Sequence, residues 1–485
     1  MGIFFGAILL VVACGGCPAS LPLSQSPGAA SRGLRIANNA QLTPAADLAD
    51  LAPEPMAKTR RRAREVVTGH PRIWLTAADL PRLRSWARAD NPLWSQGLAP
   101  LAQRAKALMD KGTVPRADKG SVSWEEYPTE MYAAFFAFMS LVHPESAARA
   151  DFSRRARTLL LHVMNTVLKA GQGAFRAPNF STYDRSRYWG ECFGLTVDWI
   201  YSSLSDSDKK TIHRVFSRWV QQNARARTTT KNHPRPRGLK RDKRLLADES
   251  AVRWSANNYY LAHLRNLTLM GLALDPADDP GGTLKGAFED AVGAWLYVND
   301  HFRRHDGRGG LSPEGPYYSP ESVSYVMQAL FALYTSGRDD PARYGRQVAL
   351  AGQPYWRDIL PAWSHLYPPA SRVRERWRGP VWEAAWSADG SREFIIDPIA
   401  IFGPLGVYHA HEGNARALAA VRWMQLHFPA GGREKLTARR DPRASFGKTY
   451  LAAGTGQLFA RTGWDANARA VRFFCGWLTV DHQHG

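Results

Sequence analysis

The sequence of 485 residues contains only four cysteines: Cys14, Cys17, Cys192 and Cys475. The first two lie in an apolar leader, so Cys192 and Cys475 are the only thiols in the part that we expect to fold. A framework of several disulfides, which stabilises many small secreted proteins, is therefore excluded. We expect two separate buried thiols, with a single Cys192–Cys475 disulfide in an oxidising compartment as the alternative.

The chain also lacks any apolar run long enough to cross a membrane as a helix. The N-terminal run at residues 3–13 is too short for that, and with the small residues after it this run resembles a secretory signal. The tetrapeptide VVAC, which ends at Cys14, resembles a bacterial lipoprotein box. We therefore expect export to the periplasm or to the outer-membrane or cell surface, with a lipid on Cys14 as the only membrane anchor.

Acidic residues are few relative to basic ones, and the formal net charge is +20. Such a balance favours an acidic partner, such as nucleic acid, an anionic membrane surface or an anionic polysaccharide. The most basic stretch, residues 225–244, has few apolar residues and no interleaved aromatics, whereas nucleic-acid sites usually combine stacking aromatics with charge. Nucleic acid is therefore not the expected partner. This stretch is a solvated loop or a rim that attracts an acidic polymer.

Hydrophobic residues make up 45% of the chain, and most recur with the period of a helix. In residues 209–222 and 321–336, for example, apolar residues follow the i, i+3, i+4, i+7 pattern of one buried face. Many such segments in series predict helical hairpins that curl into a solenoid or toroid. After about residue 445 the pattern changes to short aromatic and β-branched segments, which predict strands.

The predicted order of domains follows from these changes in composition. We expect a signal or lipoprotein leader at 1–20, a flexible linker at 21–68, a helical domain at 69–440, and the start of a β-domain at 441–485. A few strands cannot close a sandwich. We therefore expect the chain to stop inside this last domain.

Two stretches of the helical part carry polar residues that are suited to chemistry. The first is NNYY, in which Asn257 and Asn258 either cap a helix or present an amide to an anion. The second is PEGPYYSP, a Gly- and Pro-rich segment with Glu314, Tyr317 and Tyr318. It is either a turn with packing aromatics or part of a site on a loop.

Two pairs of histidines lie further along the chain. His409 and His411 form a His-x-His pair, which without a third ligand is weak support for a metal. We expect them to lie, exposed, at the start of a helix. His482 and His484, in the terminal DHQHG, would point to the same face of a strand. Such a pair can bind zinc or divide its work between catalysis and metal binding.

Taken in order along residues 69–485, these stretches resemble the heparinase II/III-like family of polysaccharide lyases, which includes alginate lyase-like enzymes. The stretches that carry the resemblance are HPRIWLTAADLPRLRSWA, LTVDWIYSSLSD, NNYY, PEGPYYSP, RTGW and DHQHG. The resemblance implies a mainly α fold, an incomplete (α/α) toroid of helical hairpins followed by the first strands of an antiparallel β-sandwich. It also implies β-elimination on an anionic polysaccharide that contains uronic acid.

The resemblance assigns roles to particular residues. Asn258, with Asn257 as the alternative, neutralises the uronate carboxylate and so stabilises the charge that forms when the C5 proton leaves. Tyr318 is the acid and, for some epimers, the base, and His482 is the partner base. Glu314 and Tyr317 are the expected substrate-binding residues.

The resemblance also implies a structural zinc ion with His484 as its first ligand. The remaining ligands of the family lie further along the sandwich, so we expect this site to be incomplete here. Some relatives carry histidine directly after the site asparagine, where this chain has Tyr259. That departure leaves the nature of the neutralising group open.

Two other functions remain as alternatives. One is a glycoside hydrolase on a similar helical toroid, which needs two carboxylates across one cleft. Glu314 is a candidate for one of them, but the sequence offers no clear partner. The other is a surface lipoprotein that binds an anionic glycan without cleaving it.

Overall fold

The structure, a computed structural model, describes most of the chain from residue 65 to residue 477. The described residues are 65–91, 93–118, 127–169, 184–225, 242–350, 352–369, 373–376, 379–382, 384, 399–426 and 442–477. The leader with Cys14, nearly all of the expected linker, most of the basic stretch and the terminal DHQHG lie outside these residues.

Helices dominate the described part, and they fall into two layers. The helices of the inner layer are α5 (Thr129–Val142), α8 (Glu191–Trp199), α11 (Asn258–Ala273), α14 (Gly315–Thr335) and α17 (Ile399–His411). The helices outside them are α6 (Ser146–Leu168), α9 (Asp206–Arg225), α12 (Thr283–Asp290), α13 (Leu296–Arg304), α16 (Pro354–Leu366) and α18 (Ala415–Leu426). The remaining helices are α2 (Leu80–Ser85), α3 (Ala99–Asp110), α4 (Thr113–Arg116), α7 (Asp184–Trp189), α10 (Glu249–Trp254) and α15 (Pro341–Tyr344).

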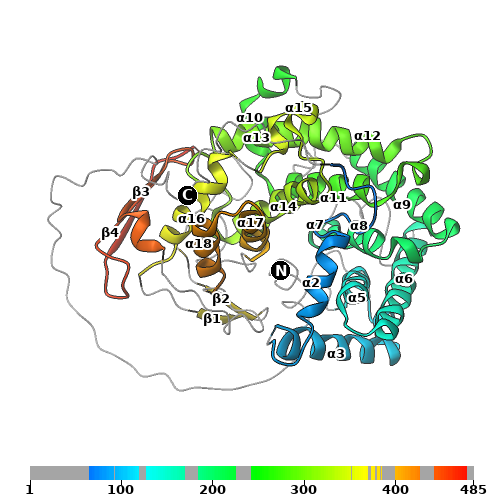
Figure 1. Cartoon of the computed structure of the whole chain (residues 1–485). Coiled ribbons are helices and arrows are strands. Elements are labelled where there is room, and N and C mark those ends of the chain that lie inside the picture. Colours follow the sequence, from blue (N-terminus) through cyan, green and yellow to red (C-terminus); the bar gives the residue numbers. More distant parts are fainter. Residues whose placement is uncertain are drawn as a thin grey trace.

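The layers form because consecutive helices pack as hairpins that stand side by side. Each inner helix packs on the next, from α5 through α8, α11 and α14 to α17, while α6, α9 and α12 pack on one another outside them. The helices accordingly follow an arc from α3 and α5 through α9 and α12 to α16 and α18 (Figure 1). This is the arrangement of an incomplete (α/α) toroid.

Burial differs between the layers. The exposed face expected for residues 321–336 is absent, because residues 321–334 of the inner helix α14 are all buried. Every residue of α8 is buried, because this helix is covered on all sides. In α9, Ile212, Val215, Phe216 and Trp219 are buried, whereas Lys210 is exposed. The amphipathic period predicted for this segment is therefore confirmed, and it places one face of α9 on the core.

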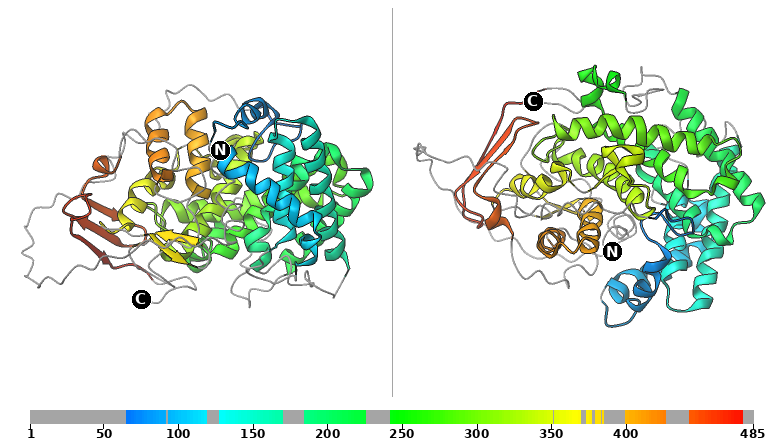
Figure 2. Two further views of the ribbon diagram at one scale, coloured as in Figure 1. Left: turned by 90° about the horizontal axis from the view of Figure 1, so that it is seen from below. Right: turned by 45° about the horizontal axis from the view of Figure 1, so that its top comes forward.

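Two small antiparallel sheets complete the fold. The first pairs β1 (Val373–Arg376) with β2 (Gly379–Trp382). The second follows the helices and has the order β3 (Thr449–Ala452), β4 (Gln457–Arg461), β5 (Ala470–Phe474). Both views of Figure 2 show these last strands at one side of the molecule and the cyan segment with α5 and α6 at the other. The predicted fold class, mainly α with antiparallel strands at the end, is confirmed.

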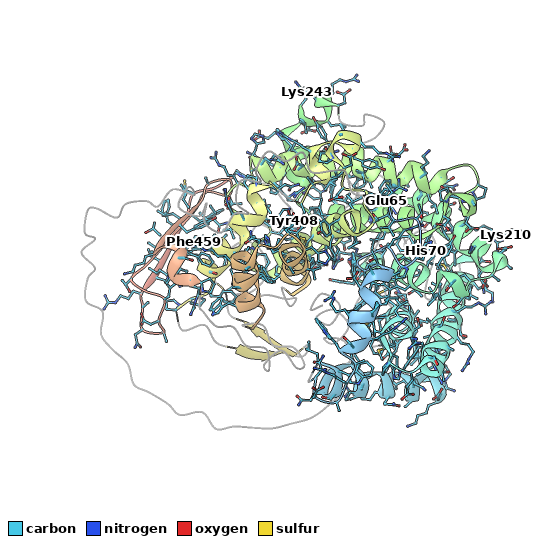
Figure 3. All side chains as sticks on the ribbon, viewed as in Figure 1. Glu65, His70, Lys210, Lys243, Tyr408 and Phe459 are labelled. Atoms are coloured by element: carbon cyan, nitrogen blue, oxygen red, sulfur yellow. The ribbon has the colours of Figure 1, made fainter. Side chains whose placement is uncertain are left out.

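The segment before the first helix forms hydrogen bonds with the C-terminal ends of α8 and α11. Asp198, at the end of α8, is fully buried and accepts hydrogen bonds from the backbone N–H groups of Arg72 (2.9 Å) and Ile73 (2.9 Å) and from His70 Nδ1 (2.6 Å). Arg72 in turn donates to the carbonyls of Leu272 and Leu274, at the end of α11. The Asp-Trp pair of the LTVDWIYSSLSD stretch thus has a structural role. Figure 3 shows His70 among the green and cyan helices.

The two cysteines are separate free thiols, as expected. Cys192 is buried in α8, but Cys475, after β5, is exposed, so the expectation of two buried thiols is wrong for Cys475. Among the described residues, no helix combines the length and apolar character that a membrane span requires.

Candidate functional site

The site begins where the NNYY stretch turns into α11. Asn257 is the N-cap of this helix, and its side-chain oxygen accepts a hydrogen bond from the backbone N–H of Tyr259 at 2.9 Å. The capping interpretation is therefore correct for Asn257. Asn258 is the first residue of the helix, and both asparagines are fully buried. The capped turn leaves the Asn258 side chain available for other partners.

Glu314 joins the two stretches that the sequence analysis singled out. It occupies the N-cap position of α14, and its Oε1 accepts hydrogen bonds from Asn258 Nδ2 (2.9 Å), the Asn258 backbone N–H (3.2 Å) and Asn257 Nδ2 (3.3 Å). Its Oε2 accepts from the hydroxyl of Ser322. The carboxylate also lies at the positive end of the α11 dipole. Glu314 is fully buried and does not face solvent, so its carboxylate serves as a hydrogen-bond acceptor for the two asparagines.

A third helix, α7, supplies a cation that the sequence analysis missed. Arg187 Nη1 donates a hydrogen bond to Oδ1 of Asn258 at 2.8 Å. The guanidinium also forms ion pairs with Glu321 and Asp184, both at 3.3 Å. Arg187 is buried, and although burial alone would lower its pKa, the nearby Glu321 raises the pKa well above the usual value. Arg187 is therefore a fixed positive charge at the site.

Two tyrosines enclose this cation. The Arg187 guanidinium lies over the ring of Tyr188 at 4.3 Å and over the ring of Tyr259 at 4.5 Å. The Tyr259 hydroxyl donates a hydrogen bond to Asp184, and burial, opposed by Arg187, raises the pKa of Tyr259. Tyr259 is therefore a neutral phenol whose hydroxyl proton is already donated to the Asp184 carboxylate.

Further buried ion pairs extend the network along the inner helices. Arg265 of α11 pairs with Glu191 of α8 at 2.9 Å. Arg185 of α7 pairs with Glu130 of α5 at 2.7 Å, with Asp118 at the same distance. Burial raises the pKa of Glu130 and of Glu191, with Arg185 and Arg265 respectively opposing the rise. Buried ion pairs thus connect α11 with α8 and α7 with α5.

The sequence contained one hint of this network. In DRSRYW, two arginines alternate with polar residues immediately before two aromatic ones. Nothing local shows that the arginines are buried, because their carboxylate partners lie in other helices.

The candidate acid lies on the same helix as Glu314. Tyr318 follows Glu314 by one turn of α14, is half-buried, and its carbonyl accepts a hydrogen bond from the Ser322 hydroxyl at 3.0 Å. Ser322 thereby connects the backbone of Tyr318 with the carboxylate of Glu314. Tyr317 also belongs to α14, but its side chain lies outside the description. Tyr318 remains the predicted acid.

The predicted residues of the C-terminus, His482 and His484, lie outside the described residues, as does Cys14. The last described residue is Trp477, and it is anchored to the helical part. Arg253 lies over its ring at 4.5 Å, the ring of Phe302 meets it edge-on, and its Nε1 donates to the carbonyl of Gly454 at 2.6 Å. Arg253 lies in α10, directly before the NNYY stretch. The chain therefore enters its final segment beside the helix that leads to Asn258.

The prediction for the His-x-His pair was wrong in the helix end and in the exposure of His409, whereas His411 is exposed as expected. His409 and His411 lie at the end of α17 rather than at the start of a helix, and His409 is buried. Burial lowers the pKa of His409 to about 4. The helix ends here because Gly413 takes the left-handed φ of 70° and Asn414 N–H bonds back to the His409 carbonyl at 2.9 Å. Among the described residues, no group of three or more His, Cys, Asp or Glu side chains could hold a metal ion.

The arrangement can hold the Asn258 amide in one orientation, between the charged groups of Arg187 and Glu314. Comparison of the chain with known protein families gives no match, and a search of the curated proteins finds no similar one.

Proposed function

We propose that this protein is an exported polysaccharide lyase that cleaves an anionic, uronic-acid-containing polysaccharide by β-elimination. The observation that carries the proposal is the convergence of NNYY and PEGPYYSP on one point. Asn258 donates to Glu314, and Tyr318 follows Glu314 by one helical turn. A carboxylate-neutralising amide and a proton-transferring phenol are the two groups that this chemistry needs most.

In this reaction Asn258 would bind the carboxylate of the uronate. An amide nitrogen carries two N–H groups, and the bond to Glu314 uses one of them. The second would donate to the substrate and stabilise the negative charge that grows when the C5 proton is removed. Because Asn258 is fully buried, the side chains over the amide have to move when the polysaccharide binds.

The proton transfers fall to Tyr318 and His482. Tyr318 would protonate the O4 leaving group, and His482 would take the C5 proton, with Tyr318 serving both steps for the other epimer. Trp477, five residues before His482, is held by contacts with α10 and α13. Its position supports a role for His482 at the site. An extended segment of five residues spans up to about 17 Å. The zinc ion implied for His484 remains part of this proposal.

The alternative of a glycoside hydrolase is weakened by the surroundings of Glu314. A hydrolase needs an exposed acid that faces a second carboxylate across a substrate. Glu314 is fully buried, and both of its oxygens are engaged by neighbouring donors.

The experiment that tests the proposal separates turnover from binding. Tyr318→Phe removes one hydroxyl and should abolish cleavage of the polysaccharide while its binding, measured by calorimetry, changes little. Tyr334→Phe is the matched control, because Tyr334 lies on the same helix about 24 Å further along, at 1.5 Å per residue. If Tyr318→Phe cleaves as fast as the unmodified chain, the proposed role of Tyr318 is wrong. If the unmodified chain binds polysaccharide but cleaves none, the protein is a glycan-binding protein.

A further inference from the structure

We propose that Arg187 is a positioning residue that sets the orientation of the Asn258 amide, so that its nitrogen rather than its oxygen is available to an anionic group. The catalytic consequence of this assignment rests on the proposed function. The orientation itself does not, because it follows from the contacts on the two sides of one side chain.

The two ends of the amide meet partners of opposite charge. Asn258 Oδ1 accepts from Arg187 Nη1 at 2.8 Å, and Asn258 Nδ2 donates to Glu314 Oε1 at 2.9 Å. Oxygen and nitrogen of an amide have nearly the same size, so sterics alone would allow either orientation. In the flipped orientation the NH2 group would face a guanidinium, which has no acceptor, and the oxygen would face a carboxylate. Both bonds would then be replaced by repulsions inside the protein.

Arg187 can impose this orientation because it is itself held on every side. It forms ion pairs with Glu321 and Asp184, and its guanidinium lies over the rings of Tyr188 and Tyr259. Its planar fork can contact several partners at fixed angles, which a lysine ammonium cannot do. A buried arginine with these contacts acts as a rigid template rather than as a mobile surface charge.

The position of Arg187 beside Asn258 also affects how an anionic ligand binds. Glu314, Glu321 and Asp184 would together repel a carboxylate that approaches Asn258. Arg187 lies among these three groups and offsets part of their charge. Loss of Arg187 should therefore both free the amide to turn and make the site more negative. Each effect weakens the stabilisation of charge that develops during a reaction, so kcat should fall more than KM rises.

The test observes the Asn258 side-chain amide directly in the full chain labelled with 15N-asparagine. Its NH2 resonances, identified by their loss in Asn258→Ser, should exchange with solvent slowly in the unmodified protein. In Arg187→Met this exchange should become at least about tenfold faster, and Arg187→Lys should fall between the two. Arg303→Lys is the matched control, because Arg303 is also buried and lies over Trp356 at 5.4 Å, and it should leave the Asn258 resonances unchanged.

Two outcomes would overturn the proposal. One is an Asn258 NH2 group that, in the unmodified chain, exchanges with solvent as fast as the NH2 group of an exposed asparagine. This outcome can be measured without any folded variant. The other is unchanged protection in a folded Arg187→Met variant. On a cleaved polysaccharide, Arg187→Met should lower kcat about 100-fold, as the loss of one oriented donor does elsewhere. Protection that depends on Arg187, in a chain that cleaves no polysaccharide, would sustain the positioning role and refute the proposed lyase activity.

Discussion

Nη1 of Arg187 lies 2.8 Å from Oδ1 of Asn258, 71 positions further along the chain, and this hydrogen bond is one of those that join α7 to α11. Glu314 joins α14 to the same asparagine from the other side. Residues of α7, α11 and α14 therefore meet around Asn258. The C-terminal ends of α8 and α11 are held by the segment around Arg72.

Removal of the Glu314 carboxylate should destabilise the protein strongly. Glu314→Ala leaves three buried N–H groups of Asn257 and Asn258 without their acceptor, at about 1–3 kcal/mol for each unsatisfied group. We expect the free energy of unfolding, measured with denaturant, to fall by at least about 3 kcal/mol. Glu314→Gln retains one acceptor oxygen and should lose about half as much. Equal losses in the two variants would mean that these hydrogen bonds are not what Glu314 contributes.

Asp198 should be equally important at the other end of the toroid. In Asp198→Asn the side chain keeps one acceptor oxygen for the backbone N–H groups of Arg72 and Ile73 and loses its charge beside His70. We expect a loss of about 1–3 kcal/mol in unfolding free energy. We also expect faster proteolysis of the chain near residue 70. Exposed Asp90→Asn serves as the control, and proteolysis at the same rate in both variants would contradict the fastening role.

The contact between α16 and the last sheet should weaken in acid. His365 is buried, its ring stacks on Tyr450, and burial, reinforced by nearby Arg461, lowers its pKa from 6.5 to about 3. Unfolding therefore takes up a proton between these two values. The stabilisation is complete above about pH 6.5 and is lost as the pH falls toward 3.

The measurement is the free energy of unfolding from pH 7 to pH 4, for the unmodified chain and for His365→Phe. The variant keeps an aromatic ring against Tyr450 but cannot take up the proton. Its pH slope should be smaller by up to about 1.4 kcal/mol per pH unit. His162→Phe, at an exposed position, should leave the slope unchanged. An identical slope for His365→Phe would show that His365 is not the group that titrates.

The two cysteines of the described chain should differ sharply in reactivity. Cys475 is exposed, whereas Cys192 is buried in α8 and burial raises the pKa of its thiol well above the usual value. Since the thiolate is the reactive form, a maleimide should label Cys475 in the native protein and reach Cys192 only after unfolding. Peptide mapping by mass spectrometry distinguishes the two. A Cys192–Cys475 disulfide in the purified protein would contradict this expectation.

The sequence predicted most of the fold because outer helices such as α9 carry clear amphipathic patterns. It also predicted a helix in α14, but the exposed face expected there is wrong, because residues 321–334 are all buried. Residues 209–222 lie in α9, and residues 321–335 lie in α14, as their apolar spacing indicates. Helices that are covered on all sides, such as α8, lack such a pattern, since every residue of α8 is buried. They are harder to recognise from the period alone.

The site was predictable only in part, for a related reason. Asn257, Asn258 and Glu314 stand in short distinctive stretches, and the structure brings these three together. Arg187 could not be found from its neighbours, because its partners come from α11 and α14 through long-range packing. The position of His409 was misjudged because the local sequence fits either end of a helix. The left-handed turn at Gly413 decides for the helix end.

Cleavage by β-elimination is tested most sharply by measuring double bonds and new reducing ends together. The purified chain is incubated with a panel of uronic-acid polysaccharides, while far-UV absorbance and new reducing ends are measured in the same samples. A lyase creates one conjugated double bond for each new reducing end, so both should rise together on at least one substrate and neither should rise with Tyr318→Phe. Reducing ends without absorbance would identify a hydrolase. No change in either, from a folded chain that binds the polysaccharide, would contradict the proposed activity altogether.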